Sequence, residues 1–283
     1  MAFLVDNDTR IVVQGLTGAT GRMAAAMMKA GGAEIVAGVT PGKGGTTAEG
    51  VPVFDTVAEA REAGATASIL FVPAALLRDA ALEAVDAGMD PIVLMVDGVP
   101  LDVSLELVSA ARERGVTLIG PNSPGVISPG KSLLGALRPD FYAAGDVALI
   151  SRSGGMMTTI AHQLTQSGRG QSTCVGVGGD AVIGLDVPTA ALLAEADPET
   201  KRLLVFGEVG TSNEERLADL VREGHVAKPV YAYIAGAAAP AGKRYSHAGA
   251  SADEAGGGAE GKRRVLREAG ITVLDRYVDA REI

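Results

Sequence analysis

Short apolar runs alternate with alanine-rich amphipathic stretches along most of the chain. Apolar runs of four to eight residues rich in β-branched side chains are typical of buried strands, and apolar residues three or four apart are typical of helices. Strands without polar alternation, separated by helices, predict parallel sheets covered on both faces. The expected strands are 10–15, 34–40, 67–72, 91–96, 116–120, 146–151, 172–179, 202–208, 228–236 and 271–275, and the expected helices of the first half are 20–30, 56–63, 74–88 and 101–115.

The alternation breaks once, in a stretch with four prolines and four glycines at 120–141. We therefore expect an α/β protein with two doubly wound parallel-sheet domains, a Rossmann-like domain over 1–122 and a second domain over 146–283, with a crossover linker over 123–145. Ligands of such sheets bind beyond the carboxyl ends of the strands.

The segment "GVISPGKS" (125–132) matches the P-loop pattern GxxxxGK[ST]. A P-loop leaves a strand directly and opens a helix. Here prolines precede the match, and Gly135 and Pro139 interrupt the residues that follow it. We therefore expect no nucleoside triphosphate site at this position and assign the segment to the interdomain crossover.

Composition and charge narrow the function classes. Hydrophobic residues make up 47% of the 283 residues, which predicts a packed core, and the formal net charge of −9 argues against nucleic acid as the main partner. Three histidines and the single Cys174, in an expected buried strand, argue against a zinc site, and we expect no metal. No apolar run approaches the ~20 residues of a membrane span, and "MAFLVDNDTR" is too short and acidic for a signal peptide, so a cytoplasmic protein without membrane contact is expected.

A glycine-rich loop, "QGLTGATGRM", follows the first expected strand. Gly15, Gly18 and Gly21 have a GxxGxxG spacing, which suits a phosphate group held at a helix N-terminus. The second strand ends without the acid that holds the ribose of NAD, and Lys43 lies nearby instead. This favours a ligand with a further phosphate, such as coenzyme A or NADP. The alternatives are glycines that only pack helix against strand, and a Lys43 that is a solvated charge.

Two features of the second half lie at strand ends. Ser153, Gly154 and Gly155 lead from a strand directly into a helix, a junction suited to an anion. Glu208 follows "RLLVFG", and the capping-box spacing of Ser212 and Glu215 places the next helix start near Ser212. A solvated loop acid is the alternative for Glu208.

His247 lies in the next crossover, within "KRYSHAGASADEAGGG". A carboxylate that accepts a hydrogen bond from one ring nitrogen fixes the tautomer and makes the other nitrogen a better nucleophile. If consecutive loops share one edge of the sheet, Ser153–Gly155, Glu208 and His247 converge, which suggests a phosphohistidine. His162, within a helix, and His225, after a helix-ending glycine, are expected to be structural or solvated.

The motifs "VTPGKGGTT", "GPNSPGVISPGK", "SRSGG", "GQSTCVGVGGD", "GEVG" and "GKRYSHAGA" occur in this order. Together they closely resemble the α subunit of succinyl-CoA synthetase (succinate–CoA ligase) and its relatives, namely malate–CoA ligase, citryl-CoA synthetase and the matching part of ATP-citrate lyase. The resemblance covers nearly the whole chain. It implies a CoA-binding Rossmann domain followed by a flavodoxin-like ligase domain.

The resemblance also implies an acid–CoA ligase that works with a β subunit, as αβ or α2β2. That subunit carries an ATP-grasp domain, which binds ATP or GTP with Mg²⁺. The nucleotide phosphorylates His247, a carboxylic acid takes the phosphoryl group to become an acyl phosphate, and the thiolate of coenzyme A displaces the phosphate. The carried-over positions are His247 as the phosphoryl carrier, Glu208 as the residue that orients it, Ser153, Gly154 and Gly155 as the phosphate-binding helix start, and Thr17, Gly18, Ala19, Thr20, Gly21, Lys43, Met95, Val96 and Asp97 as CoA contacts.

Four departures from the family pattern touch the acid pocket. Thr158 stands where the family has a substrate-contacting tyrosine, and Ser123, Thr211 and Ser246 replace a cysteine and two glycines. Succinate is therefore the default acid, with malate and citrate as alternatives. A CoA- or nucleotide-binding module without catalysis is the competing hypothesis. An NADP-dependent oxidoreductase would need a catalytic Tyr–Lys pair, and the chain contains no YxxxK.

Overall fold

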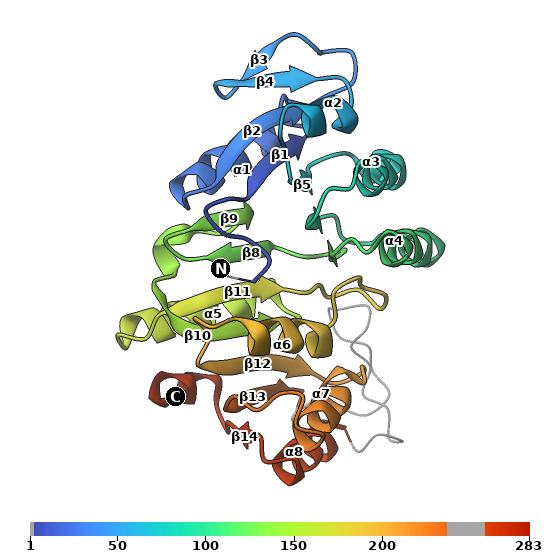
Figure 1. Cartoon of the computed structure of the whole chain (residues 1–283). Coiled ribbons are helices and arrows are strands. Elements are labelled where there is room, and N and C mark those ends of the chain that lie inside the picture. Colours follow the sequence, from blue (N-terminus) through green and yellow to red (C-terminus); the bar gives the residue numbers. More distant parts are fainter. Residues whose placement is uncertain (1–2, 237–257) are drawn as a thin grey trace.

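Two sheets of seven strands stack end to end in the computed structural model, which describes residues 3–236 and 258–283 (Figure 1). The first sheet has the order β3-β4-β2-β1-β5-β6-β7. Its central strand is apolar on both faces, since Ile11, Val12 and Val13 are all fully buried. The strands are β1 (Arg10–Gln14), β2 (Glu34–Val39), β3 (Thr47–Ala48), β4 (Val51–Phe54), β5 (Ala67–Leu70), β6 (Ile92–Leu94) and β7 (Leu118–Ile119).

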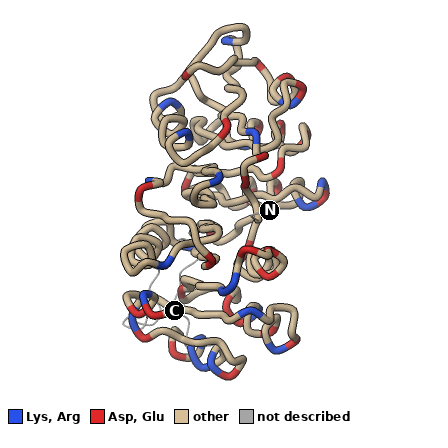
Figure 2. Tube along the Cα trace, turned by 60° about the vertical axis from the view of Figure 1, so that its left-hand side comes forward, with Lys and Arg blue, Asp and Glu red and all other residues tan. Residues whose placement is uncertain are grey.

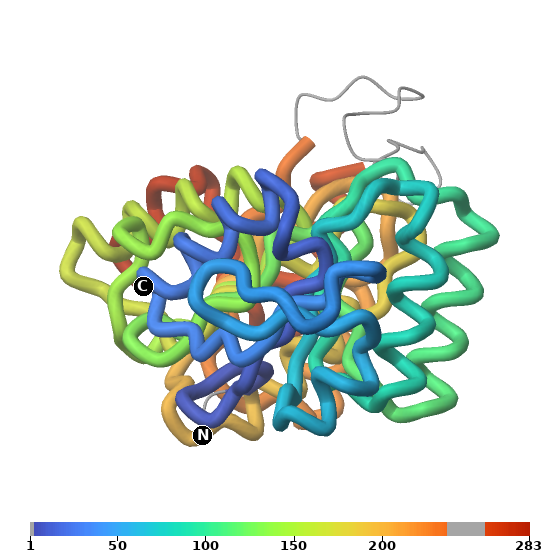
Figure 3. Tube along the Cα trace, turned by 90° about the horizontal axis from the view of Figure 1, so that it is seen from above, coloured from blue at the N-terminus to red at the C-terminus, as the bar shows by residue number. Residues whose placement is uncertain are grey.

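Helices cover both faces of the first sheet. α1 (Ala19–Ala30) packs on one face, where Met28 belongs to the same core cluster as Ile11. α2 (Val57–Glu62), α3 (Ala74–Asp86) and α4 (Leu101–Arg114) pack on the other face, where Leu77 and Leu107 join Val12 in a separate core cluster. Figure 3 shows α3 and α4 side by side, in teal and green, at one side of the molecule.

The second sheet has the order β14-β13-β12-β10-β11-β8-β9. α5 (Gly154–Gln166) packs with η3 (Tyr277–Glu282), whereas α6 (Val187–Ala196), α7 (Asn213–Arg222) and α8 (Gly258–Glu268) pack against one another in sequence. The strands are β8 (Gly125–Ser128), β9 (Ser132–Gly135), β10 (Ala144–Ser151), β11 (Gln171–Gly176), β12 (Arg202–Glu208), β13 (Val230–Ala235) and β14 (Thr272–Val273).

The stretch expected to be a crossover linker contains a β-hairpin of the second sheet. β8 and β9 are antiparallel, and β8 also pairs antiparallel with β11. Gly125 has φ +98°, and a Cβ there would lie 2.1 Å from the carbonyl oxygen of Leu134, so only glycine fits this close pairing. Lys131 lies in the turn and a strand follows it, so the P-loop match was rightly rejected. A short 3-10 helix, η1 (Pro139–Phe141), then leads to β10.

The two-domain α/β architecture is confirmed, and all ten expected strands are present in the described residues. The ten expected strands pair with one another in parallel, and both sheets are mixed because the additional pairs β3–β4 and β8–β9 are antiparallel. α7 starts where expected, but its capping box does not form: the Ser212 side chain makes no capping bond. Basic and acidic residues are interspersed along the trace (Figure 2). Among the described helices, none combines the length and apolarity that a membrane span needs.

Candidate functional site

The carboxyl ends of β1, β5 and β6 border one cavity of about 540 Å³. The three strands are parallel neighbours, so the loops that follow them meet at the same edge. Gly18–Gly21 at the start of α1, Phe71–Pro73 and Met95–Val96 line the cavity. The structure thus brings together most of the residues predicted to contact CoA, from loops more than 70 residues apart.

The glycines of this loop serve two purposes. Gly15 has φ +80°, and a Cβ there would lie 2.3 Å from the carbonyl oxygen of Phe71; a Cβ on Gly21 would lie 2.4 Å from the carbonyl oxygen of Gly15. Both glycines are therefore required by the packing of α1 on the strands. Gly18 is exposed at the N-cap of α1, whose first N–H groups point out of the helix end. The packing explanation thus holds for Gly15 and Gly21, and Gly18 faces the cavity.

Lys43 lies beside the glycine loop. Its Nζ is 3.3 Å from Oγ1 of Thr17, which is in turn 3.2 Å from Oγ1 of Thr40 at the end of β2. An exposed ammonium and a helix N-terminus at one strand edge form a positive environment, which suits a ligand that carries several phosphates. Asp97 is exposed and is not among the residues that line the cavity. Its predicted contact stays a prediction.

Arg152 links two loops at the equivalent edge of the second sheet, where the strands have their carboxyl ends. It follows β10, which lies between β11 and β12, and its side chain reaches the ends of both neighbours. Nε donates to Oε1 of Glu208 at 2.8 Å, and Nη2 donates to the carbonyl oxygen of Asp180 at 3.0 Å. The side chain of Arg152 is 1% exposed and that of Glu208 is 10% exposed. Glu208 closes β12 as a buried, ion-paired carboxylate, so the alternative of a solvated loop acid is wrong.

The start of α5 adjoins this ion pair. Ser153 is the N-cap, and its Oγ accepts from the N–H of Met156 at 3.4 Å. The hydroxyl of Ser151 accepts from the N–H of Ser153 and donates to its carbonyl oxygen. A Cβ on Gly154 would lie 3.0 Å from Pro124, whereas a Cβ on Gly155 would meet no atom within 4 Å. The first glycine is therefore needed for packing, and the space at the second is open to an anion.

The remaining predicted site residues have different outcomes. His247 and Ser246 lie outside the described residues. The Thr158 hydroxyl donates to the carbonyl oxygen of Gly154 at 3.1 Å and therefore accepts from the hydroxyl of Tyr142 at 3.0 Å. Burial raises the pKa of Tyr142, so that phenol stays protonated beside Thr158. A substrate contact by Thr158 stays a prediction.

The other histidines and the cysteine lie where they were expected. The ring of His162 packs on Phe141 within the α5 region, with centroids 4.7 Å apart, and His225 is exposed beside Glu223. Cys174 is fully buried in β11, where burial raises the pKa of its thiol well above the ordinary value. Over residues 3–236 and 258–283, no group of three or more His, Cys, Asp and Glu side chains is arranged to hold a metal ion.

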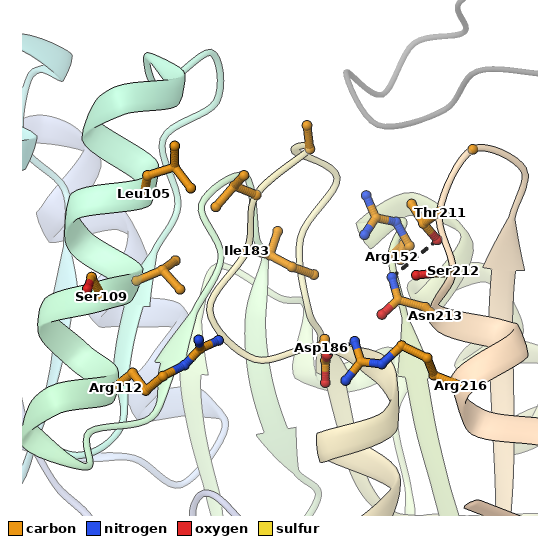
Figure 4. A pocket seen from close by; sticks show the side chains of 14 residues that line it. Leu105, Ser109, Arg112, Arg152, Ile183, Asp186, Thr211, Ser212, Asn213 and Arg216 are labelled. Atoms are coloured by element: carbon orange, nitrogen blue, oxygen red, sulfur yellow. Dashed lines mark hydrogen bonds and ion pairs between the residues drawn. The ribbon is translucent and has the colours of Figure 1, made fainter. Parts of the chain in front are cut away.

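A larger cleft of about 920 Å³ separates α4 from the loops of the second sheet (Figure 4). Arg152 lies at one wall of this cleft, and Leu105 and Arg112 of α4 lie at the opposite wall. Lower in the cleft, Arg216 of α7 pairs with Asp186 at 2.6 Å. Arg152 thus forms part of the cleft wall, whereas its partner Glu208 is not among the residues that line the cleft. No sequence motif predicted Arg152 as part of the site, although it lies inside the quoted "SRSGG".

Comparisons with known proteins agree with this arrangement. The family described as CoA binding domain matches residues 6–98, and the family described as CoA-ligase matches residues 150–273. The chain is 48% identical to a succinate–CoA ligase [ADP-forming] subunit alpha 2 of Archaeoglobus fulgidus over 100% of this chain and 98% of that protein. It is 43% identical to the malate–CoA ligase subunit alpha of Methylorubrum extorquens over 96% of this chain and 94% of that protein.

A solved structure shares the fold. The structure of ATP citrate lyase from Methanothrix soehngenii, in complex with citrate and coenzyme A, aligns with a TM-score of 0.88 at 24% identity over 99% of this chain. The chain spans 49% of that longer protein. The sequence identity to the curated relatives, over nearly their whole length, decides the family. The chain belongs to the family of succinate–CoA ligase α subunits, with a CoA binding domain followed by a CoA-ligase domain.

Proposed function

We propose that this protein is the α subunit of an NTP-dependent acid–CoA ligase that works through a phosphohistidine at His247. The observation that carries the proposal is the Arg152 bridge, which fixes the buried carboxylate of Glu208 next to the open helix start at Gly155. A carboxylate that orients an imidazole and a helix start that accepts a phosphoryl group are the two parts that such a carrier needs.

The division of roles follows from the chemistry. The carboxylate of Glu208 accepts the N–H of one imidazole nitrogen of His247, so the other nitrogen is the nucleophile. That nitrogen attacks the terminal phosphorus of the nucleotide, an N–P bond forms, and the P–O bond to the nucleoside diphosphate breaks. The N–H groups of Gly154 and Gly155, the hydroxyl of Ser153 and the positive end of α5 hold the phosphoryl oxygens. An oxygen of the carboxylic acid then takes the phosphoryl group and leaves a neutral imidazole.

The first cavity supplies the thiol substrate in this proposal. Gly18 to Gly21 at the start of α1, together with Lys43 and Thr17, hold the phosphates of CoA, while Met95 and Val96 provide an apolar wall. The thiolate displaces phosphate from the acyl phosphate, so the thioester C–S bond forms as the acyl C–O bond breaks. The fit rests on the cation and the exposed helix start that the structure places together at this edge.

The partner in this proposal is an ATP-grasp β subunit, assembled as αβ or α2β2, that binds ATP or GTP with Mg²⁺. The "[ADP-forming] subunit alpha" names of the relatives support a separate nucleotide-binding chain, as does the absence of a P-loop at 125–132. The acid is succinate by default. Malate and citrate remain alternatives because Thr158 replaces the tyrosine expected from the family pattern. We place the complex in the cytoplasm.

The test is a phosphorylation assay on the complex. The chain is co-expressed with its ATP-grasp β subunit, and the purified complex is incubated with γ-labelled ATP. We expect acid-labile, base-stable label on wild type and on His225→Ala, whose histidine is exposed, and none on His247→Ala. Label that persists in His247→Ala contradicts the assignment. Thioester formation with succinate, malate and citrate then identifies the acid, and an equal absence of product with all three contradicts the substrate class.

A further inference from the structure

A buried lysine joins α8 to the first turn of α7 and to the loop before it. Lys262, 5% exposed, lies in the second turn of α8. Its Nζ donates to Oε2 of Glu214 at 2.8 Å, to Oε2 of Glu215 at 2.7 Å and to the carbonyl oxygen of Thr211. All three donors of the ammonium are thereby satisfied by residues more than 45 positions earlier in the chain.

The ion pair continues to the peptide group of Glu208. Glu214 is 1% exposed, and while its Oε2 accepts from Lys262, its Oε1 accepts from the backbone N–H of Glu208 at 3.1 Å. Gly207 leaves the space for this carboxylate, because a Cβ there would lie 2.5 Å from Oε1 of Glu214. The chain of contacts therefore runs from Lys262 through Glu214 to the residue that holds the Arg152 guanidinium.

An exposed ion pair would be enough to link α7 to α8, so the burial of this network points to a further role. A buried ammonium and carboxylate carry a large desolvation penalty, and in some proteins such groups are retained because they fix a specific conformation. Here the conformation fixed is that of the strand end at Glu208, which is also the end held by Arg152. The backbone N–H of Glu208 is bound by Glu214, and its carboxylate is bound by Arg152.

We propose that Lys262 and Glu214 are positioning residues that set the backbone of Glu208 for the phosphoryl transfer of His247. The inference rests on the proposed function. The segment that carries His247 continues in sequence into α8, and Lys262 stands 15 residues after that histidine. Lys262 thus connects the element that follows the phosphohistidine segment to the strand that carries its orienting carboxylate.

The test compares phosphorylation rates in the intact complex with its β subunit. Lys262→Met removes the ammonium and leaves Glu214 as a buried carboxylate, and we expect the rate of phosphohistidine formation to fall about tenfold to a hundredfold, the loss typical of a misplaced group. Lys262→Arg keeps the charge, and we expect it to restore most of the rate. The matched control is Lys228→Met, since Lys228 also joins two elements, through the carbonyl oxygens of Ala194 and Asp197, but has no bond to the Glu208 network.

A double variant covers the case in which Lys262→Met fails to fold. Lys262→Met with Glu214→Leu removes both charges and the acceptor of the Glu208 N–H together, so it avoids the uncompensated buried carboxylate. We expect its melting temperature to approach that of Lys228→Met and its phosphorylation rate to stay low, with the KM for ATP unchanged because the nucleotide site lies on the partner. A double variant that labels at the wild-type rate overturns the positioning role. If wild type and His247→Ala label alike, the proposed function fails first. If wild type labels, His247→Ala does not, and the Lys262 variants label at the wild-type rate, the inference fails alone.

Discussion

Replacement of Arg152 by methionine tests whether the end of β10 is held by a buried ion pair. Arg152→Met keeps much of the apolar stem of the side chain and removes the guanidinium that bonds Glu208 at 2.8 Å and the carbonyl oxygen of Asp180 at 3.0 Å. With side chains 1% and 10% exposed, water does not replace the lost partner. Breaking such a buried pair costs about 3–5 kcal/mol.

That cost is large against the ~5–15 kcal/mol of a typical folded protein. For a chain of this size it corresponds to a fall in Tm of roughly 6 to 20 °C. Urea unfolding followed by circular dichroism gives the free energy of unfolding, and differential scanning calorimetry gives the Tm. Arg152→Lys is expected to lie between wild type and Arg152→Met, because one ammonium cannot reproduce the forked geometry that serves Glu208 and Asp180 together.

The matched control is Arg276→Met. Nη2 of Arg276 is 2.6 Å from Oδ1 of Asp279, closer than the Arg152 pair, but the Arg276 side chain is 73% exposed. We expect no measurable change in the urea midpoint, since exposed pairs contribute little. The reasoning is refuted if Arg152→Met costs less than ~1 kcal/mol, the range of an ordinary surface pair, or if both arginine variants lose equal stability. A double-mutant cycle with Glu208→Gln then measures the coupling between the two side chains.

Two further predictions concern the stability of variants at Gly207 and Asp186. Gly207→Ala places a Cβ 2.5 Å from Oε1 of Glu214, so we expect a loss of about 1–3 kcal/mol from overpacking, measured by urea unfolding; an unchanged midpoint would show that Glu214 moves freely. At Asp186, burial raises the pKa, but the hydrogen bonds from Thr189 and Arg216 outweigh it and lower the pKa below the ordinary value. A carboxyl group whose pKa is lowered in the folded state stabilises the fold above its unfolded pKa, and this stabilisation is lost as the pH falls through the folded pKa. Between pH 6 and pH 3 the Tm of wild type should therefore fall further than that of Asp186→Asn. Parallel Tm curves for the two proteins would contradict this.

The strand ends of the site were predictable because strand positions follow from local apolar runs. Because parallel strands have their carboxyl ends at one edge, Ser153 and Glu208 were expected near the same edge of a sheet, but the pairing of β10 with β12 is known only from the structure. The glycine spacing of the first loop was equally local, although the structure shows that Gly15 and Gly21 are needed for packing. These parts depend on the nearest few residues only.

The ion pairs were not predictable, because they join positions far apart in the chain. Glu215 has capping-box spacing from Ser212, yet its carboxylate bonds Lys262, which lies 47 residues later. No pattern in the sequence indicates that competition. The β8–β9 hairpin was missed for a related reason. Its strands are only four residues each, and the proline and glycine between them are also typical of a linker sequence.

The β8–β9 hairpin holds the two sheets together and limits where the chain can be divided into fragments. β9 contacts α1 of the first sheet, and a Cβ on Gly31 would lie 2.8 Å from the side chain of Leu133, so the joint is closely packed. One core cluster runs from Ile11 through Leu133 to Leu149, across both sheets. The junction between the two sheets is therefore closely packed and does not have the loose packing expected of a hinge. A fragment cut at residue 146 would leave β11 as a bare apolar edge. The close packing also fixes the spacing between the two candidate sites at the sheet edges.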